Sequence, residues 1–298
     1  MAPALVGHAG TPVTVDGEAL EALLRGTFYK MSGSGNDFVF FDARAAGAPP
    51  DVPAHRVTAL CARGTGIGAD GLVIMDQPSA DGVRIAYWNS DGSRAALCGN
   101  ATLCTAGLAV HLGAARTGTD FTVTTDAGAF RARVTDGTGP MFELAPVQAL
   151  ELDTPDALAD TAAGPEQRIG FAVAGVPHVV VRVPDVEAVD LATRSPGLRA
   201  PSADRPNGAN VNYVSPTTDG RWLMRTFERG VEGETLACGT GAVACAAVLQ
   251  AWGEARAEVG ILTRSGQQLT VILGDPAGRP TLTGEGRLVF VGTLAQRS

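Results

Sequence analysis

Hydrophobic runs separated by glycine-rich turns define the chain from residue 27 onward. Residues 27–43 carry β-branched and aromatic side chains on both sides of a glycine turn, which predicts two successive strands. Residues 55–75 show helical spacing of apolar positions, then a glycine-rich turn, then a continuous apolar run typical of a buried strand. These patterns predict a compact fold that mixes strands and helices.

The first 26 residues differ from this pattern. They are rich in small residues, glycine and proline, and only residues 17–25 suit a short helix. The start has no basic region and carries Asp16, Glu18 and Glu21, so it does not resemble a secretory signal. We expect residues 1–26 to form a flexible N-terminal extension.

Two separate elements recur along the chain at nearly one offset. In one, a Cys-Gly pair opens a run of small residues that closes at a glycine; the other is a strand-Gly-strand hairpin. The matched segments are 97–113 with 237–253, and 121–134 with 260–273. Cys98 and Cys238 lie 140 positions apart. Two matches in register indicate internal duplication, and facing halves favour a small-molecule site at their interface.

Composition narrows the classes of function. A length of 298 residues suggests about two domains, and 45% hydrophobic against 18% charged residues suits folded cores. The net charge of −8 argues against nucleic-acid binding, which needs clustered cations. No apolar run reaches the roughly 18 residues that a membrane span requires. We therefore expect a cytoplasmic protein with no nucleic-acid or membrane partner.

The basic residues and cysteines restrict the cofactors. Of the 23 basic residues only Lys30 is a lysine, so a Schiff-base or pyridoxal-phosphate mechanism has a single candidate. The five cysteines are odd in number and unpaired in sequence, which disfavours a disulfide framework. The CxxC, HxxxH and HExxH spacings of metal sites are absent. We expect neither a cofactor nor a metal.

One glycine pattern resembles a dinucleotide-binding loop. Gly66, Gly68 and Gly71 fit G-x-G-x-x-G. That loop must follow a strand and precede a helix, whereas here a helical stretch precedes it and a strand follows. We interpret these residues as turn glycines.

Cys98 and Cys238 are the strongest candidates for chemistry. Each precedes a glycine and a helix, so each thiol is expected near a helix N-terminus, where free N–H groups lower its pKa. One of them could act as a nucleophile with a histidine base. Duplication instead supplies two equivalent groups, which suits removal of a proton from one face of a carbon and its delivery to the other. The other cysteines, Cys61, Cys104 and Cys245, lie in apolar helical patterns and are expected to pack in the core.

Six motifs spread over most of the chain resemble the diaminopimelate epimerase family. They are GSGNDF (33–38), GIGADG (66–71), NSDGSRAALCGN (89–100), GVPH (175–178), NVNYV (210–214) and ERGVEGETLACGTGA (228–242). The resemblance implies an α+β fold of two pseudo-symmetric domains, each a curved β-sheet around a central helix. It places the first domain at 27–145, the second at 146–283, and returns a C-terminal strand within 284–298 to the first.

The resemblance also implies an activity and a set of site residues. Members of the family interconvert LL- and meso-diaminopimelate, an intermediate of lysine and peptidoglycan-precursor synthesis, without a cofactor, and are often homodimers. Cys98 and Cys238 match the two catalytic cysteines, and His178 and Glu228 match residues that adjust the pKa of the thiols. The implied substrate contacts are Asn36, Asn89, Gly99, Asn100, Asn212, Glu228, Arg229, Gly239 and Thr240.

The chain departs from the family pattern at three places. Val176 replaces an asparagine of the GNPH motif, Ala101 replaces a glycine of CGNG, and Gly71 stands where many members have glutamine. Two other functions stay open. A proline or hydroxyproline racemase also uses a cysteine pair, although its second cysteine usually follows D-x-x-P, unlike residues 234–237 here. A non-catalytic ligand-binding protein of this fold would need neither Cys98 nor Cys238.

Overall fold

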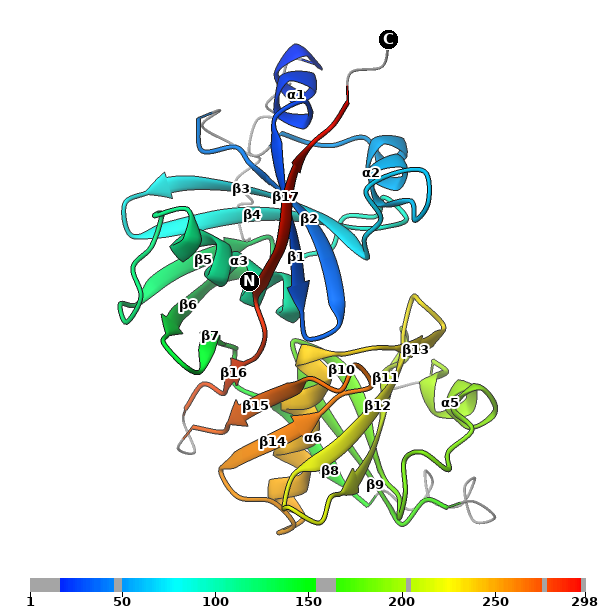
Figure 1. Ribbon diagram of the computed structural model, residues 1–298. Helices are drawn as coiled ribbons and strands as arrows, with labels where there is room; N and C mark the ends of the chain where they lie inside the picture. The colour runs from blue at the N-terminus through cyan, green and yellow to red at the C-terminus, as the bar shows by residue number, and fades with distance from the viewer. Residues whose placement is uncertain (1–16, 46–49, 154–164, 202–204, 275–277, 296–298) are drawn as a thin grey trace, which may run out of the picture.

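The chain forms an α+β structure of two halves, each a curved sheet around one helix (Figure 1). The computed structural model describes residues 17–45, 50–153, 165–201, 205–274 and 278–295. The first half contains α1 Gly17–Leu24, β1 Thr27–Gly33, β2 Asn36–Asp42, α2 Ala54–Cys61, β3 Gly71–Ser79, β4 Gly82–Asn89, α3 Gly99–His111, β5 Phe121–Thr125, β6 Gly128–Thr135, β7 Gly139–Glu143 and β17 Arg287–Thr293. The second half contains β8 Gln148–Leu152, β9 Arg168–Ala174, β10 Val176–Arg182, α5 Leu191–Arg199, β11 Asn210–Pro216, β12 Trp222–Glu228, β13 Gly233–Thr235, α6 Gly239–Ala251, β14 Glu258–Leu262, β15 Gln268–Ile272 and β16 Thr281–Thr283.

The two halves repeat the same strand pairing. In the first, neighbouring strands run in the order β17, β1, β2, β3, β4, β5, β6, β7. In the second, the order is β8, β9, β10, β11, β12, β14, β15, β16. The parallel pairs β2–β3 and β4–β5 correspond to β10–β11 and β12–β14. This repetition confirms the predicted pseudo-symmetry.

The first half takes its edge strand β17 from the end of the chain, beyond the second half. β8 follows β7 in the chain but pairs with β9, and β17 follows β16 but pairs with β1. The two sheets also meet directly, because β7 pairs antiparallel with β16. The chain therefore crosses between the halves twice. The paired strands β7 and β16 lie below α3 in Figure 1.

The central helices α3 and α6 are buried on nearly all sides. Each has 13 residues, and small or apolar side chains fill almost every position. A helix that is apolar all round has to lie inside the fold, because it has no polar face to offer to water. Small side chains also let the curved sheet approach the helix closely. The run from Gly241 to Leu249 in α6 is wholly buried.

Helix α1 corrects the prediction for the N-terminal segment. Residues 17–24 form a helix, and its Leu20 and Leu24 are buried in a cluster with Phe28 and Phe41. This part of the segment is packed against the first sheet, so it is no flexible extension; residues 1–16 lie outside the described residues. The hydrophobic positions four residues apart explain the docking, since they share one helix face.

The glycine motif lies in a turn, as predicted. Gly66 and Gly68 follow α2, and Gly71 is the first residue of β3. Gly68 has a φ of 80°, which favours glycine. Among the described residues no helix is long and apolar enough to cross a bilayer.

Candidate active site

Two helix N-termini meet between the halves. Cys98 and Cys238 are the residues that precede α3 and α6, and both have extended backbones, with φ near −133° and −137°. A Cβ atom added to Gly99 would lie 3.5 Å from Cα of Gly239. The free N–H groups of both first turns therefore converge on one place, which is favourable for an anion.

A cleft of about 630 Å³ opens at this meeting point. It is lined by every site residue named from the sequence except His178 and Asn212. Those lining residues are Asn36, Asn89, Cys98, Gly99, Asn100, Glu228, Arg229, Cys238, Gly239 and Thr240. The cleft brings together side chains that are up to 243 positions apart in the chain, from Asn36 to Arg279.

The amide of Asn36 is held from both ends. Its Nδ2 donates to Oδ2 of Asp70 over 3.0 Å, and its Oδ1 accepts from Nδ2 of Asn100 over 2.6 Å. Asn100 is 2% exposed, and its Oδ1 has no hydrogen-bond partner within the described structure. Oδ1 of Asn100 is therefore an unsatisfied acceptor beneath the wall of the cleft, and a buried unpaired acceptor is costly.

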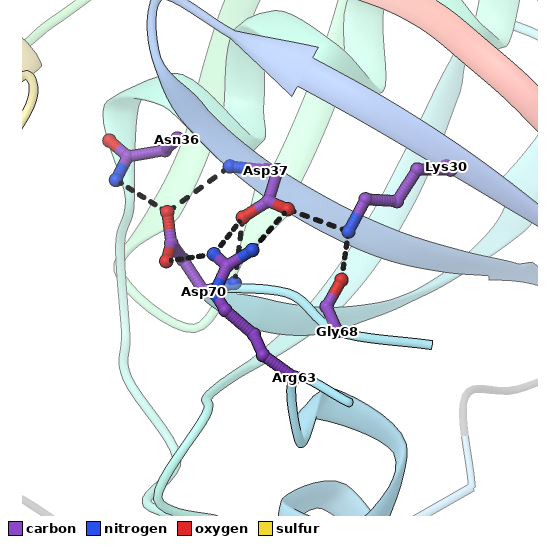
Figure 2. Close-up of polar contacts among 6 residues, drawn as sticks. All are labelled: Lys30, Asn36, Asp37, Arg63, Gly68 and Asp70. Carbon is purple, nitrogen blue, oxygen red and sulfur yellow. Dashed lines mark hydrogen bonds and ion pairs between the residues drawn. The ribbon is translucent and has the colours of Figure 1, made fainter. Parts of the chain in front are cut away.

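Charged residues behind Asn36 fix its orientation (Figure 2). Arg63 bridges Asp37 and Asp70, with nitrogen–oxygen distances of 2.6 and 2.8 Å. Lys30 pairs with Asp37 over 2.7 Å and also donates to the carbonyl of Gly68. The single lysine therefore has a structural role here and does not line the cleft.

His178 reaches Cys238 through a hydroxyl. Nε2 of His178 lies 3.1 Å from Oγ1 of Thr240, which lies 3.6 Å from Sγ of Cys238. The histidine is fully buried, and burial together with the nearby charge of Arg229 lowers its pKa to about 3. His178 is therefore neutral at pH 7, and Thr240 lies between its ring and the Cys238 thiol.

Asn212 does not line the cleft, which corrects its assignment as a substrate contact. Its amide is fully buried and contacts Nδ1 of His178, the carbonyl of Val179 and the hydroxyl of Thr226. Asn210, two residues earlier, lines the cleft instead. Asn212 contacts the histidine ring, and Asn210 is the asparagine of β11 that lines the cleft.

The thiols have raised pKa values, opposite to the expectation from their helix position. Burial raises the pKa of Cys98 to about 11 and that of Cys238 to about 12, and the charge of Glu228 adds to both. The N–H groups of Asn100 and Gly241 do lower these pKa values, but less than burial raises them. Desolvation outweighs the helix terminus at both positions, although Cys238 is buried and Cys98 keeps some exposed surface.

Glu228 and Arg229 place opposite charges at the end of β12. Burial raises the pKa of Glu228, and the charge of Asp70 acts in the same direction. The backbone N–H of Arg229 donates to Oδ1 of Asn210 over 2.9 Å. One wall of the cleft therefore offers a carboxylate, a guanidinium and an amide, which together suit a ligand with an ammonium and a carboxylate.

The remaining cysteines pack in the cores. Cys104 and Cys245 have no exposed surface, and Cys61 is 3% exposed. All five cysteines are free. Within the described part of the chain, no three His, Cys, Asp or Glu residues are arranged to hold a metal ion.

Sequence reasoning did not single out four polar residues that line the cleft. They are Asp70, Tyr87, Asn210 and Arg279. The strand pairing explains why Asn210 reaches the cleft. Val211 lies opposite Phe227, so Asn210 lies beside Glu228 at the end of the strand. Asn212 lies opposite Thr226, deeper in the sheet.

Comparisons with known proteins agree with this geometry. The diaminopimelate epimerase family model matches residues 28–149 and 171–288. A diaminopimelate epimerase of Gemmatimonas aurantiaca is 49% identical over 90% of this chain and 99% of its own. One from Aquifex aeolicus is 38% identical over 90% and 98%. A probable proline racemase from Agrobacterium radiobacter shares the fold, with a TM-score of 0.63 at 19% identity, over 91% of this chain and 93% of its own.

The duplicated α+β fold and its cleft between two helix N-termini define a class that includes amino-acid epimerases and racemases. Within that class, the chain belongs to the diaminopimelate epimerase family, a family of isomerases.

Proposed function

We propose that this protein interconverts LL- and meso-diaminopimelate with Cys98 and Cys238 as the two acid–base groups. The observation that carries the proposal is the convergence of both cysteines, each at a helix N-terminus, on one cleft lined with groups for a zwitterion. Membership of the family supports the choice of substrate.

The helix N-termini would bind the carboxylate at the reacting centre. N–H groups of the first turns of α3 and α6 converge at Gly99 and Gly239. When the α-carbon loses its proton, negative charge spreads onto this carboxylate, and fixed N–H groups stabilise it there. This arrangement stabilises the carbanion without an external electron sink.

The two thiols would divide the proton transfers. In one direction the thiolate of Cys238 takes the α-proton, and the thiol of Cys98 delivers a proton to the opposite face, leaving a Cys98 thiolate and a Cys238 thiol. The reverse reaction starts from that state. Like-charge repulsion between close sulfurs disfavours ionisation of both, which maintains one thiol and one thiolate.

The raised thiol pKa values suit this chemistry. A thiolate of high basicity is a stronger acceptor for a weakly acidic α-proton. The carboxylate of Glu228 raises the pKa of both thiols. A substrate ammonium bound beside Glu228 would offset that charge, so substrate binding promotes ionisation of one thiol at the moment it is needed.

The far end of the substrate would be bound by Arg229 and Asn210. Asn36, Asn89 and the unpaired oxygen of Asn100 would serve the ammonium groups. Val176 lines the cleft where the family pattern has an asparagine, so one hydrogen bond, worth about 1 kcal/mol, is absent.

We also infer the biological setting from the family. The product would serve lysine and peptidoglycan-precursor synthesis in the cytoplasm, and the active form would be a homodimer. We take residues 27–145 and 284–298 as one domain and 146–283 as the other, and the pairing of β17 with β1 supports this division.

An assay with LL-diaminopimelate and L-proline in deuterium oxide tests the function. We expect turnover of diaminopimelate alone, with deuterium at the α-carbon of the product and little in recovered substrate at early times. Turnover of proline would favour the racemase alternative, and binding without turnover of either would favour a ligand-binding protein.

A further inference from the structure

Tyr87 is a polar cleft residue to which the mechanism above gives no role. It lies on β4, and its side chain is 8% exposed. Its hydroxyl donates to Oδ1 of Asn89 over 2.9 Å, and its ring packs edge-on against Phe38 with centroids 6.0 Å apart. Tyr87 and Cys98 line the same cleft.

Gly71 creates the space for this ring. A Cβ atom at Gly71 would lie 2.5 Å from Cε2 of Tyr87 and 3.1 Å from its hydroxyl oxygen. The backbone itself does not require glycine here, because Gly71 does not have a positive φ. Glycine at this position therefore leaves room for the phenol ring at the cleft wall, and the close contact fixes the position of the ring.

The second half has a hydroxyl close to its cysteine, which suggests a comparison with the Tyr87 hydroxyl. In the second half, Thr240 supplies a hydroxyl 3.6 Å from Sγ of Cys238. Its equivalent 140 positions earlier is Asn100, whose Nδ2 donates to Asn36. The equivalent of Tyr87 in the second half is Phe227, which has no hydroxyl. In the first half, the hydroxyl that lines the cleft together with the cysteine therefore belongs to Tyr87.

We propose that Tyr87 is a positioning residue for Cys98, whose hydroxyl turns from Asn89 to the sulfur when Cys98 becomes a thiolate. This role rests on the proposed function of Cys98 as an acid–base group. In the thiol state the phenol donates to Asn89. In the thiolate state it donates to the sulfur, and Oδ1 of Asn89 is released to accept from a substrate ammonium. Only hydrogen bonds change, so no proton is transferred to Tyr87.

The electrostatic surroundings support this switch. Tyr87 lowers the pKa of Cys98, whereas burial, Cys98, Glu228 and Asp70 raise the pKa of the phenol. The phenol therefore keeps its proton and can act only as a donor toward a thiolate. The titratable groups around the Cys98 sulfur are Tyr87 on β4, Glu228 on β12, Cys104 within α3 and Cys238 at the start of α6.

The test compares Tyr87→Phe with Tyr213→Phe, both in a Cys238→Ala background. Phenylalanine keeps the ring over Gly71 and removes only the hydroxyl. Tyr213 is fully buried in the second half and does not line the cleft, so its variant is a matched control. The readout is the rate of alkylation of Cys98 by iodoacetamide against pH, measured by peptide mapping.

We expect Tyr87→Phe to shift the alkylation profile of Cys98 upward by about one pH unit, which is roughly tenfold in thiolate fraction. The Tyr213→Phe profile should match the parent. With Cys238 restored, Tyr87→Phe should lower kcat for diaminopimelate about tenfold. An unchanged alkylation profile would overturn the role of Tyr87. Because alkylation does not depend on turnover, that result differs from absence of epimerase activity, which would overturn the proposed function.

Discussion

Gly99 and Gly239, the first residues of the two central helices, are in contact across the boundary between the halves. A Cβ atom added to either would lie 3.5 Å from Cα of the other. Because each glycine directly follows a cysteine, this contact brings the two thiols to one cleft. A side chain at position 239 would also meet Leu282, whose Cδ2 lies 2.9 Å from the added Cβ, so it would push the two helix starts apart.

Removal of either cleft cysteine should abolish epimerisation. Cys98→Ala leaves the carbanion without a donor on one face, and Cys238→Ala does so on the other, so each variant can only regenerate its starting configuration. Chiral chromatography of the reaction mixture measures the product. Cys104→Ala and Cys245→Ala, which change buried core positions, should keep activity and lose about 1–3 kcal/mol of unfolding free energy. An inactive Cys104→Ala beside an active Cys98→Ala would contradict the assignment.

Catalytic efficiency should rise with pH between 6.5 and 8.5. With thiol pKa values of about 11 and 12, the form with one thiolate grows roughly tenfold per pH unit in this range. His178 should add no step near pH 6.5, because its pKa is lowered to about 3. Measured kcat/KM against pH checks both points; a plateau from pH 6.5 onward would mean that a thiolate already exists in the free enzyme.

Much of the fold and part of the site could be predicted from the sequence. The duplication was visible because the Cys-Gly helices and the hairpins repeat with few insertions between them. The cleft cysteines followed from their place before each helix. These are local features, which residue type and spacing determine directly.

The errors concern properties that only tertiary packing decides. Asn210 and Asn212 are both in β11 and point to the same side, so spacing cannot tell which one reaches the cleft. The thiol pKa depends on burial between two halves that are far apart in sequence, and burial reversed the direction expected from the helix N-terminus. The docking of α1 likewise depends on apolar surface that the sheet presents to it.

The acidic residues behind Asn36 should affect substrate binding. Asp70 accepts hydrogen bonds from Asn36 and from Arg63. Asp70→Asn replaces an acceptor with a group that can also donate, which loosens the amide of Asn36. We expect kcat/KM to fall about tenfold, mainly through KM, which corresponds to loss of roughly one hydrogen bond to a charged group. Asp136→Asn, at an exposed position, is the control and should behave as the parent.

Buried neutral His178 should make the protein sensitive to acid. Its folded pKa of about 3 lies below the ordinary value of 6.5, so the unfolded chain binds more protons between these limits. The contribution of His178 to the free energy of unfolding is therefore fully present above pH 6.5. It falls as the pH decreases, with a slope that approaches about 1.4 kcal/mol per pH unit. Urea unfolding at pH 7, 6 and 5 measures this slope. His178→Gln should flatten it, whereas His55→Gln, at an exposed position, should not.

The close packing of the Tyr87 ring against Gly71 predicts a steric penalty for any side chain at position 71. Gly71→Ala would place its Cβ 2.5 Å from the Tyr87 ring and 2.7 Å from the carbonyl oxygen of Trp88, and backbone cannot yield easily. We expect a loss of about 1–3 kcal/mol of unfolding free energy, as for overpacked cores. Gly233→Ala is the matched control, since nothing lies within 4 Å of its added Cβ and its φ is not left-handed. Urea denaturation compares the two variants with the parent, and equal stability of all three would mean that Tyr87 is not fixed by Gly71.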